Sequence, residues 1–323
     1  MKALVTGARG FGGSWLARAL LERGEVVVGL DRQTGRPSGL ALLGIEADVR
    51  QEAADVRDAE RISAVVSSHA PDVVFHLAAQ AIVGDAMASP VATFRTNVEG
   101  TWNLLEAARA ADVGAVVVAS SDKAYGRHEA LPYTEDAALE PAFPYDVSKA
   151  AADLISRSYW HSFGLPVAVT RFANIYGGGD LNFSRLVPEA VSAVLEGRRP
   201  VIRSDGSPER DFLYVEDVAS AYLAVADAVV AGRGRGEAFN AGWGRPNTVG
   251  EVVELVCEVA GAEVTPDFRG RGNPRGEIDR QFLDSAKLRG LTGWEPQVKL
   301  REGLGRTIEW YRANPEARAP APA

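Results

Sequence analysis

The glycine cluster near the N-terminus constrains the fold of this chain more than any other sequence feature. The segment TGARGFGG, residues 6–13, separates a short apolar run from an amphipathic segment. Gly7 permits a tight turn, Gly10 lets the backbone approach a pyrophosphate, and Gly13 lets a helix pack closely on a strand. The helix that follows would offer free N–H groups and its positive dipole end to phosphates. A glycine-rich turn without a ligand is the alternative, and the position after an N-terminal strand disfavours it.

Short apolar runs alternate with amphipathic segments through the first half of the chain. The predicted strands are residues 2–6, 25–30, 73–77, 115–119 and 167–171, and the predicted helices are residues 14–23, 59–68, 90–111 and 145–163. Strands that alternate with helices are typical of a parallel sheet covered on both faces. We therefore predict an α/β fold, a Rossmann-type doubly wound parallel sheet.

The second half of the chain follows this alternation less regularly. We predict a dinucleotide-binding domain over residues 1–176 and a smaller C-terminal substrate-binding lobe over residues 177–316. Some segments after residue 177 should return to the large domain, and helices are expected at residues 217–230 and 248–260. The Ala/Pro-rich residues 317–323 are predicted to form a disordered tail.

Composition excludes several classes of function. The net charge of −8 over 323 residues argues against nucleic acid or an anionic membrane as the main partner, although local arginines can still bind a phosphorylated small molecule. No apolar run approaches the roughly 18 residues of a membrane span, and no signal peptide is recognisable. Because Cys257 is the only cysteine, an internal disulfide is impossible. We therefore expect a cytoplasmic protein.

Asp31 lies at the end of the second predicted strand, about 20 residues beyond the glycine cluster. An acidic side chain at this position can bond both ribose hydroxyls of a dinucleotide, and it would repel a 2′-phosphate. The position therefore favours NAD over NADP. The neighbouring Arg32 leaves NADP open, because an arginine there can receive the 2′-phosphate. A turn residue at the strand end is the structural alternative for Asp31.

Tyr145 and Lys149 are four residues apart on one predicted helix, so their side chains share a face. A lysine ammonium at this distance can lower the pKa of the tyrosine and bind a ribose. The tyrosinate can then accept a proton from a sugar hydroxyl as hydride leaves the carbon. This spacing is common by itself, but here it follows a strand that ends in Ser120 and Ser121, on a chain with an N-terminal glycine loop.

Ten segments in order along the chain resemble extended short-chain dehydrogenases of the NAD-dependent nucleotide-sugar epimerase/dehydratase family. They are TGARGFGG (6–13), Asp31, DV (55–56), HLAAQ (76–80), TNVEGTWNLLEA (96–107), SSDKAYG (120–126), PYDVSK (144–149), RFANIYGGG (171–179), RDFLYVEDVA (210–219) and LTGWEP (291–296). The resemblance implies NAD as the cofactor and a nucleotide-diphosphate sugar as the substrate.

The resemblance also implies roles for individual residues. Ser121, Tyr145 and Lys149 would act on the sugar, with Ser121 bonded to its O4. The cofactor site would include Phe11, Asp55, Val56, Leu77, Ala78, Ala79, Gln80, Asn97, Ser120 and Phe172, in addition to the glycines, Asp31 and Arg32. Asp55 and Val56 would border the adenine. The substrate site would include Asn174, Arg185, Leu186, Arg210 and Arg275. A surface ion pair of Arg210 with Asp211 or Asp217 is the structural alternative.

Asp122 and Lys123 bear on the type of reaction. The family shares oxidation of the sugar at C4, and a 4-epimerase needs little beyond Ser or Thr, Tyr and Lys. A 4,6-dehydratase also needs an acid that protonates the C6 hydroxyl and a base that removes the C5 proton. The Ser-Asp-Lys sequence resembles CDP-glucose 4,6-dehydratases, whereas many other dehydratases have Glu at the third position. The RDFLYVEDVA segment instead resembles epimerases and dTDP-sugar dehydratases.

These features favour a 4,6-dehydratase and keep a 4-epimerase as the alternative, with Asp122 and Lys123 then a solvated pair beside the site. A dinucleotide-sensing regulator without catalysis is a distant third, because it would not need Ser121, Tyr145 and Lys149.

No metal site is predicted, because the four histidines lack ligand spacing; His76 is interpreted as a buried, hydrogen-bonded histidine. The family resemblance implies a homodimer through a four-helix bundle formed by the helices at 90–111 and 145–163, the first of which carries an apolar stripe. The stripe consists of Val91, Phe94, Val98, Leu104 and Leu105.

Overall fold

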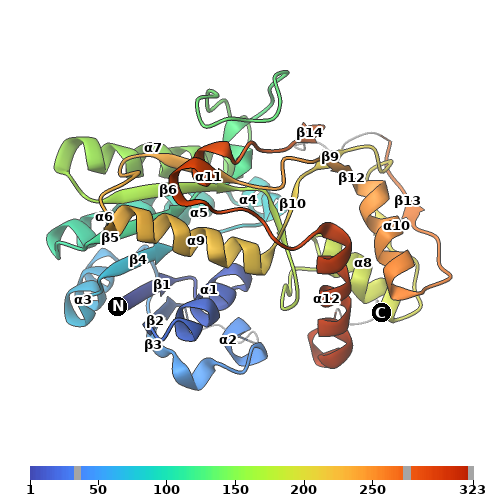
Figure 1. Cartoon of the computed structure of the whole chain (residues 1–323), viewed down its shortest axis with the longest axis horizontal. Coiled ribbons are helices and arrows are strands. Elements are labelled where there is room, and N and C mark those ends of the chain that lie inside the picture. The colour runs from blue at the N-terminus through green and yellow to red at the C-terminus, as the bar shows by residue number, and fades with distance from the viewer. Residues whose placement is uncertain (33–37, 272–277, 319–323) are drawn as a thin grey trace.

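A layered α/β domain and a smaller helical lobe form the computed structural model, which describes residues 1–32, 38–271 and 278–318 (Figure 1). Within these residues, seven parallel strands form one sheet in the order β11-β6-β5-β4-β1-β2-β3. The strands are β1 (Lys2–Thr6), β2 (Val26–Asp31), β3 (Arg50–Ala53), β4 (Val73–His76), β5 (Ala115–Ala119), β6 (Val167–Phe172) and β11 (Ala238–Ala241). The predicted doubly wound parallel sheet is confirmed.

The two faces of the sheet bury separate apolar cores, because successive side chains of a strand point to opposite faces. On β1, Ala3 and Val5 belong to one core, and Leu4 belongs to the other. The first core is covered by α1 and α9, and the second by α3, α6 and α7 (Figure 1). The bounds of these helices are α1 (Phe11–Glu22), α3 (Ala59–His69), α6 (Gly100–Ala110), α7 (Pro144–Phe163) and α9 (Val215–Val230).

The helix expected over residues 90–111 is interrupted by a π-helical turn. It consists of α5 (Pro90–Phe94), the turn η2 (Arg95–Glu99) and α6. Within the turn, the side chain of Asn97 bonds to the backbone of Gln80 in both directions, and the Asn97 carbonyl accepts a hydrogen bond from the Thr101 hydroxyl. A π turn inside an α-helix is frequently found at a functional site.

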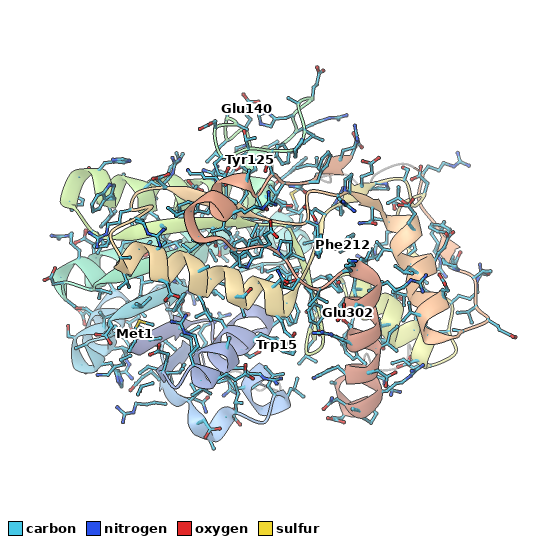
Figure 2. All side chains as sticks on the ribbon, in the orientation of Figure 1. Met1, Trp15, Tyr125, Glu140, Phe212 and Glu302 are labelled. Atoms are coloured by element: carbon cyan, nitrogen blue, oxygen red, sulfur yellow. The ribbon has the colours of Figure 1, made fainter. Side chains whose placement is uncertain are left out.

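The smaller lobe has its own core, built around α8, α10 and α12 (Figure 1). Its elements are β7 (Asn174–Tyr176), α8 (Leu186–Leu195), β8 (Val201–Ile202), β9 (Glu209–Arg210), β10 (Phe212–Tyr214), β12 (Asn247–Thr248), α10 (Val249–Ala260), β13 (Asp267–Phe268), β14 (Arg280–Gln281) and α12 (Leu300–Ala313). Trp15 of α1 joins the two parts, because its indole N–H donates to the Gly178 carbonyl over 2.8 Å (Figure 2).

Short elements complete the chain, and segments after residue 176 return to the large domain. The short elements are α2 (Gly39–Leu42), η1 (Glu46–Asp48), α4 (Val83–Ala88), η3 (Asp122–Tyr125), α11 (Ala286–Thr292) and η4 (Pro315–Ala317). Strand β11 pairs with β6, and α9 packs beside α1. Of the expected tail, Ala317 is buried and Arg318 donates to the Tyr311 carbonyl, whereas residues 319–323 lie outside the described residues.

None of the helices in the described ranges has both the length and the apolar character of a membrane span.

A buried ion pair fixes α7 against the sheet. Arg171 of β6 is 1% exposed and donates to both carboxylate oxygens of Asp153 on α7, with Nε–Oδ2 and Nη2–Oδ1 distances of 2.7 and 3.1 Å. Its Nη1 donates to the Tyr125 hydroxyl and to the Glu135 carbonyl. Tyr125 lies below the loop that carries Glu140 (Figure 2). One guanidinium group therefore connects α7, the end of β5 and this loop to the sheet.

We predict that Asp153→Asn destabilises the fold by about 3–5 kcal/mol, because it leaves the Arg171 charge buried without a counter-charge. Asp227→Asn is the matched control: Asp227 is 54% exposed and pairs with Arg23 at the surface, so its loss should cost about 1 kcal/mol or less. Chemical denaturation monitored by circular dichroism measures both changes. Equal losses of unfolding free energy in the two variants would contradict the role assigned to Arg171.

Candidate functional site

The glycine loop joins β1 to α1 with very little space between them. Gly7 has φ +74°, and a Cβ there would lie 2.8 Å from the backbone nitrogen of Ala78. A Cβ at Gly13 would lie 2.1 Å from the Gly7 carbonyl oxygen. Side chains are therefore excluded at both positions. Gly10 is the N-cap of α1, and no acidic side chain occupies the first turn, so the helix can bind an anion at its N-terminus.

Asp31 lies beside this loop at the end of β2. Its two carboxylate oxygens accept hydrogen bonds from the backbone nitrogens of Arg9 and Arg32, over 3.1 and 2.8 Å. Burial raises the pKa of Asp31. The side chain of Arg9 turns away to Glu46 and Gln51, with Nη1–Oε1 distances of 3.0 and 2.6 Å. The carboxylate therefore borders the loop as expected for a group that bonds a ribose.

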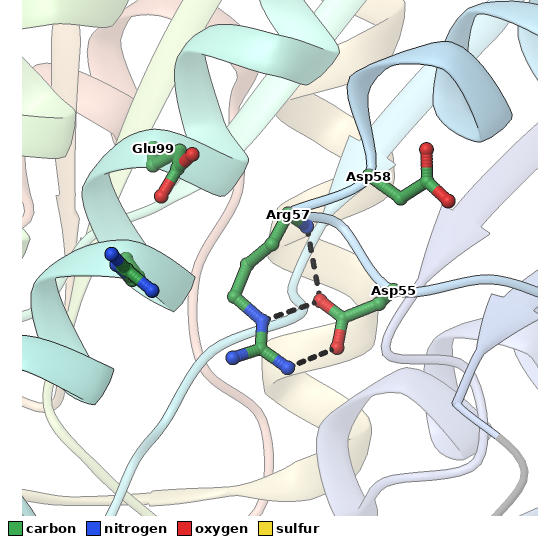
Figure 3. Close-up of a pocket in the computed structure, with 5 residues that line it drawn as sticks. Asp55, Arg57, Asp58 and Glu99 are labelled. Carbon is green, nitrogen blue, oxygen red and sulfur yellow. Dashed lines mark hydrogen bonds and ion pairs between the residues drawn. The ribbon is translucent and has the colours of Figure 1, made fainter.

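Asp55 and Val56 follow β3. They lie two and three residues after Ala53, which pairs with Asp31 in the sheet. Val56 is buried and packs against Gly100. The Asp55 carboxylate is held by Arg57, with distances of 2.9 Å to Nε and 2.6 Å to Nη2. Figure 3 shows this pair in a surface pocket, with Glu99 on the facing helix. The sequence did not predict this ion pair, which lowers the pKa of Asp55.

The segment after β4 forms the other wall of the loop. Leu77 and Ala78 donate backbone hydrogen bonds to the carbonyl and hydroxyl oxygens of Thr6. Ala79 lies between them and Gln80, whose backbone is held by Asn97. The predicted wall of Leu77, Ala78, Ala79 and Gln80 thus lies along the glycine loop. The absent side chains at Gly7 and Gly13 let the backbone segments meet closely, and the N-terminus of α1 beside them carries the free N–H groups that suit an anion such as a pyrophosphate.

Ser121, Tyr145 and Lys149 come together at the carboxyl end of β5. The Ser121 hydroxyl lies near the Tyr145 hydroxyl and acts to lower the pKa of Tyr145. Lys149 donates from Nζ to the Ala119 carbonyl over 2.8 Å, and Ser120 donates to the Lys149 carbonyl over 3.0 Å. The sequence predicted that Tyr145 and Lys149 share a helix face, and the structure brings that face to the serines.

Burial shifts the pKa values of this group in opposite directions. It lowers the pKa of Lys149 to about 8 and raises that of Tyr145 to about 12, because each shift favours the neutral form. The nearby guanidinium of Arg185 and the bond from Ser121 act against the shift of Tyr145. Additional positive charge near the Tyr145 hydroxyl would therefore promote its ionisation.

Asp122 is buried immediately beside Ser121. One carboxylate oxygen accepts a hydrogen bond from the Ser121 hydroxyl over 3.0 Å, and the other has no partner among the described residues. Burial raises the pKa of Asp122, while the charges of Lys123 and Arg210 act in the opposite direction. Such a carboxyl group is suited to carry a proton and to donate it to a ligand.

The predicted substrate residues lie where the sheet meets the lobe. Asn174 donates from its backbone and side-chain nitrogens to the Asp211 carbonyl, and Arg210 is buried beside it in β9. Arg185 caps α8, whose first residue is Leu186, and pairs with Asp180 over 2.9 Å. Phe172 ends β6 and packs on the ring of Tyr222. Arg275 lies outside the described residues.

Asp211 and Asp217 were the alternative partners of Arg210. Both carboxylates accept hydrogen bonds from backbone nitrogens. The Asp211 carboxylate accepts from the backbone nitrogens of Trp243 and Gly244, and Asp217 accepts from Gln297 and Val298. Burial raises the pKa of Asp211 to about 6. Arg210 donates to the carbonyls of Glu209 and Asp279.

Two polar side chains near Arg210 escaped the sequence analysis. Gln281 pairs with Arg210 between β14 and β9, and both polar atoms of its buried amide lack a partner among the described residues. Trp243, next to Asp211, likewise has a buried indole N–H without a partner in that part of the chain. Buried groups of this kind are uncommon and are candidates for contact with a ligand. No spacing or motif in the sequence marked either residue.

His76 is buried at the end of β4 and hydrogen-bonded on both ring nitrogens, as predicted. Burial, with a smaller contribution from Lys149, lowers its pKa to about 3, so the ring is neutral. Within the described ranges, no group of three or more His, Cys, Asp or Glu side chains is arranged to hold a metal ion.

Comparison with known proteins gives matches over nearly the whole chain. The chain is 36% identical to a UDP-glucose 4-epimerase of Mycolicibacterium smegmatis, covering 97% of this chain and 99% of that protein. It is also 36% identical to a dTDP-glucose 4,6-dehydratase of Streptomyces griseus, with 95% and 93% covered. The crystal structure of a Streptomyces venezuelae dTDP-glucose 4,6-dehydratase with NAD bound superposes with a TM-score of 0.89 at 33% identity, covering 99% of each chain.

Residues 3–242 match the model of the NAD dependent epimerase/dehydratase family. This range contains the glycine loop, Asp31, Ser121 and the Tyr145–Lys149 pair. The chain therefore belongs to the NAD-dependent epimerase/dehydratase family.

Proposed function

We propose that this protein is an NAD-dependent 4,6-dehydratase of a nucleotide-diphosphate hexose. The observation that carries this proposal is Asp122, a buried carboxyl group with a raised pKa and one free oxygen, directly beside Ser121. A 4-epimerase has no step that needs such an acid, whereas a dehydratase must protonate the departing C6 hydroxyl. Both activities occur among the relatives with 36% identity, so overall similarity does not separate them.

The residues present fit NAD. The tight turn through Gly7 and Gly13 brings β1 against the N-terminus of α1, where no acidic side chain would repel a pyrophosphate, and Asp31 borders the loop with its carboxylate. We assign the adenosine half to Asp31, Asp55 and Val56, and the nicotinamide half to Tyr145 and Lys149. When bound, NAD would supply the hydride acceptor for oxidation at C4 and the hydride donor for reduction at C6.

The first step is oxidation of the sugar at C4. Tyr145 accepts the proton of the C4 hydroxyl as the hydride leaves the carbon, which gives a 4-keto sugar. The Lys149 ammonium and Arg185 would stabilise the tyrosinate, because the charge of Arg185 acts against the rise that burial causes in the pKa of Tyr145. Ser121 orients the C4 oxygen by its hydrogen bond. The sugar nucleotide would extend from here over Asn174, Arg185, Leu186 and Arg210 into the lobe.

The second step is elimination of water from C5 and C6. The 4-keto group acidifies the C5 hydrogen, and we propose that the amine of Lys123 takes that proton. Asp122 donates its proton to the C6 hydroxyl, the C6–O bond breaks, and water leaves. After hydride is added at C6, Lys123 returns a proton to C5. The step thus needs a protonated carboxyl group, which the burial of Asp122 favours.

A 4-epimerase is the second candidate. The match with an epimerase of M. smegmatis covers 99% of that protein, and Ser121, Tyr145 and Lys149 suffice for that reaction. In that case Asp122 and Lys123 would only support Ser121, through the bonds that they make to its hydroxyl.

We also propose a cytoplasmic homodimer. Five large apolar side chains on α5, α6 and α7 are 36–66% exposed: Val91, Phe94, Trp102, Leu154 and Phe163. Leu104 and Leu105 of the predicted stripe are instead buried in the core. Packing of these helices on a second copy would cover the five residues. A single buried cysteine, Cys257, is consistent with a reducing compartment.

The reaction is tested by mass spectrometry of NAD-supplemented enzyme with CDP-, dTDP-, UDP- and GDP-hexoses in deuterated water. We expect a product that has lost one water and gained one solvent deuteron at C5. Asp122→Asn should slow water loss about 100-fold or more, because the amide cannot donate the proton, and Tyr145→Phe should block both steps. Asp227→Asn, far from the site on α9, is the control. A product of unchanged mass with new stereochemistry would identify an epimerase.

The Lys149 charge should destabilise the folded protein without cofactor. Its pKa is about 8 in the folded state against 10.5 for an ordinary lysine, so the folded state loses a proton that the unfolded chain keeps between these pH values. Wild-type stability therefore gains a contribution as the pH rises from about 8 to about 10.5. Lys149→Met should be more stable than wild type by about 2 kcal/mol at pH 7, once the loss of the hydrogen bond to Ala119 is subtracted from the gain of removing the buried charge. This advantage should vanish near pH 10. Denaturation at several pH values measures it; a difference independent of pH contradicts the prediction.

The dimer is tested by sedimentation equilibrium. Wild type should have twice the 34.4 kDa mass of one chain, and Val91→Glu with Leu154→Glu should give the monomer, because two buried charges oppose association. Val230→Glu is the matched control, since Val230 is 51% exposed on α9, away from the proposed interface. A dimer that withstands the double substitution, or one that Val230→Glu dissociates, contradicts this interface.

A further inference from the structure

A continuous chain of buried hydrogen bonds crosses the domain behind the glycine loop. The Ala78 backbone nitrogen donates to the Thr6 hydroxyl over 3.1 Å, and this hydroxyl bonds His76 Nδ1 over 2.8 Å. On the other side of the ring, Nε2 bonds the Thr101 hydroxyl over 3.1 Å. Thr101 in turn donates to the Asn97 carbonyl over 2.6 Å. The chain therefore runs from the residue before Gly7 to the π-helical turn η2.

The direction of these bonds follows from the number of protons. The only hydrogen of the Thr101 hydroxyl goes to the Asn97 carbonyl, so Thr101 accepts from His76 Nε2. Nδ1 of the neutral ring is then an acceptor, and the Thr6 hydroxyl donates to it. A single tautomer of His76, protonated at Nε2, satisfies every partner in the chain.

The far end of the chain reaches the helix that carries Tyr145 and Lys149. The side-chain nitrogen of Asn97 donates to the Ser148 hydroxyl over 2.8 Å, and Ser148 donates to the Tyr145 carbonyl over 2.6 Å. Ser148 is fully buried and adjacent to Lys149 in sequence. The glycine loop and α7 are thus linked through His76 and η2, although no element joins them directly.

We propose that His76 is a positioning residue that holds the dinucleotide loop and the Tyr145–Lys149 face in a fixed relative placement. This inference rests on the proposed function in assigning that face to catalysis. The pyrophosphate would bind at one end of the chain, and the nicotinamide ribose at the other. An apolar side chain at position 76 could fill the same space, but it could not bond both Thr6 and Thr101.

The test is to remove one hydroxyl at each side of the ring. Thr101→Val keeps the shape of the side chain but removes the hydroxyl that bonds His76 Nε2, and Thr101→Ser keeps that hydroxyl. Thr307→Val is the matched control, because Thr307 is also fully buried and donates to the carbonyl four residues earlier, Gly303, in the lobe. NADH affinity by fluorescence titration, kcat, KM and thermal unfolding are measured for each.

We expect Thr101→Val to weaken NADH binding and to lower kcat, each roughly tenfold, because a buried hydrogen-bonding group loses its partner. The KM for the sugar nucleotide should change less than twofold. Thr101→Ser should restore both values, and Thr307→Val should change neither. Thr6→Val should resemble Thr101→Val, and the double variant should be no worse than either alone, because both break one chain.

Wild-type NADH affinity in Thr101→Val, or multiplied effects in the double variant, would overturn the role of His76. NADH binding is measured without sugar, so it tests this role even if no sugar nucleotide is converted. Absence of conversion by wild type would instead reject the proposed dehydratase.

Discussion

The buried pair of Arg171 and Asp153 is the interaction on which the arrangement of this protein depends. It fixes α7, which carries Tyr145 and Lys149, to the strand that leads into the lobe. A buried guanidinium is stabilised only when its donors are satisfied, and here the carboxylate, the Tyr125 hydroxyl and the Glu135 carbonyl satisfy them. The same group therefore determines the position of the catalytic candidates relative to both walls of the site.

Burial disfavours the charged forms of the ionisable groups in this site. Burial raises the pKa values of Tyr145 and Asp122 and lowers that of Lys149, so each shift favours the uncharged form. A positively charged nicotinamide ring beside Tyr145 would favour the tyrosinate, in the same direction as Arg185. Asp122 instead has to remain protonated to donate to a hydroxyl. Burial thus suits an acid at Asp122, and positive charge near Tyr145 suits a base there, within a single small site.

Close backbone contacts at two glycines give the glycine loop, the other half of the site, its shape. Gly13 lies against the Gly7 carbonyl, and Gly7 against the backbone of Ala78, so β1, α1 and the segment after β4 meet at one point. The hydrogen-bonded chain through Thr6, His76 and Thr101 then continues from this point to η2. Hydrogen bonds between polar groups, and not apolar packing alone, thus connect the glycine loop to α7, the helix that carries Tyr145.

The sequence by itself determined the parallel sheet, the glycine loop, Asp31 and the shared face of Tyr145 and Lys149, because these depend on local spacing along a strand or helix. It could not determine contacts between residues distant in the chain. The charge of Arg185 lies near Tyr145 only because the lobe folds back, and Gln281 lies beside Arg210 only through pairing of β14 with β9. The ion pair of Asp55 with Arg57 is local, but it depends on side-chain rotamers that sequence spacing does not fix. Asp122, which carries the proposed reaction, is likewise buried near the charge of Arg210, a residue of the lobe that is distant from it in the chain.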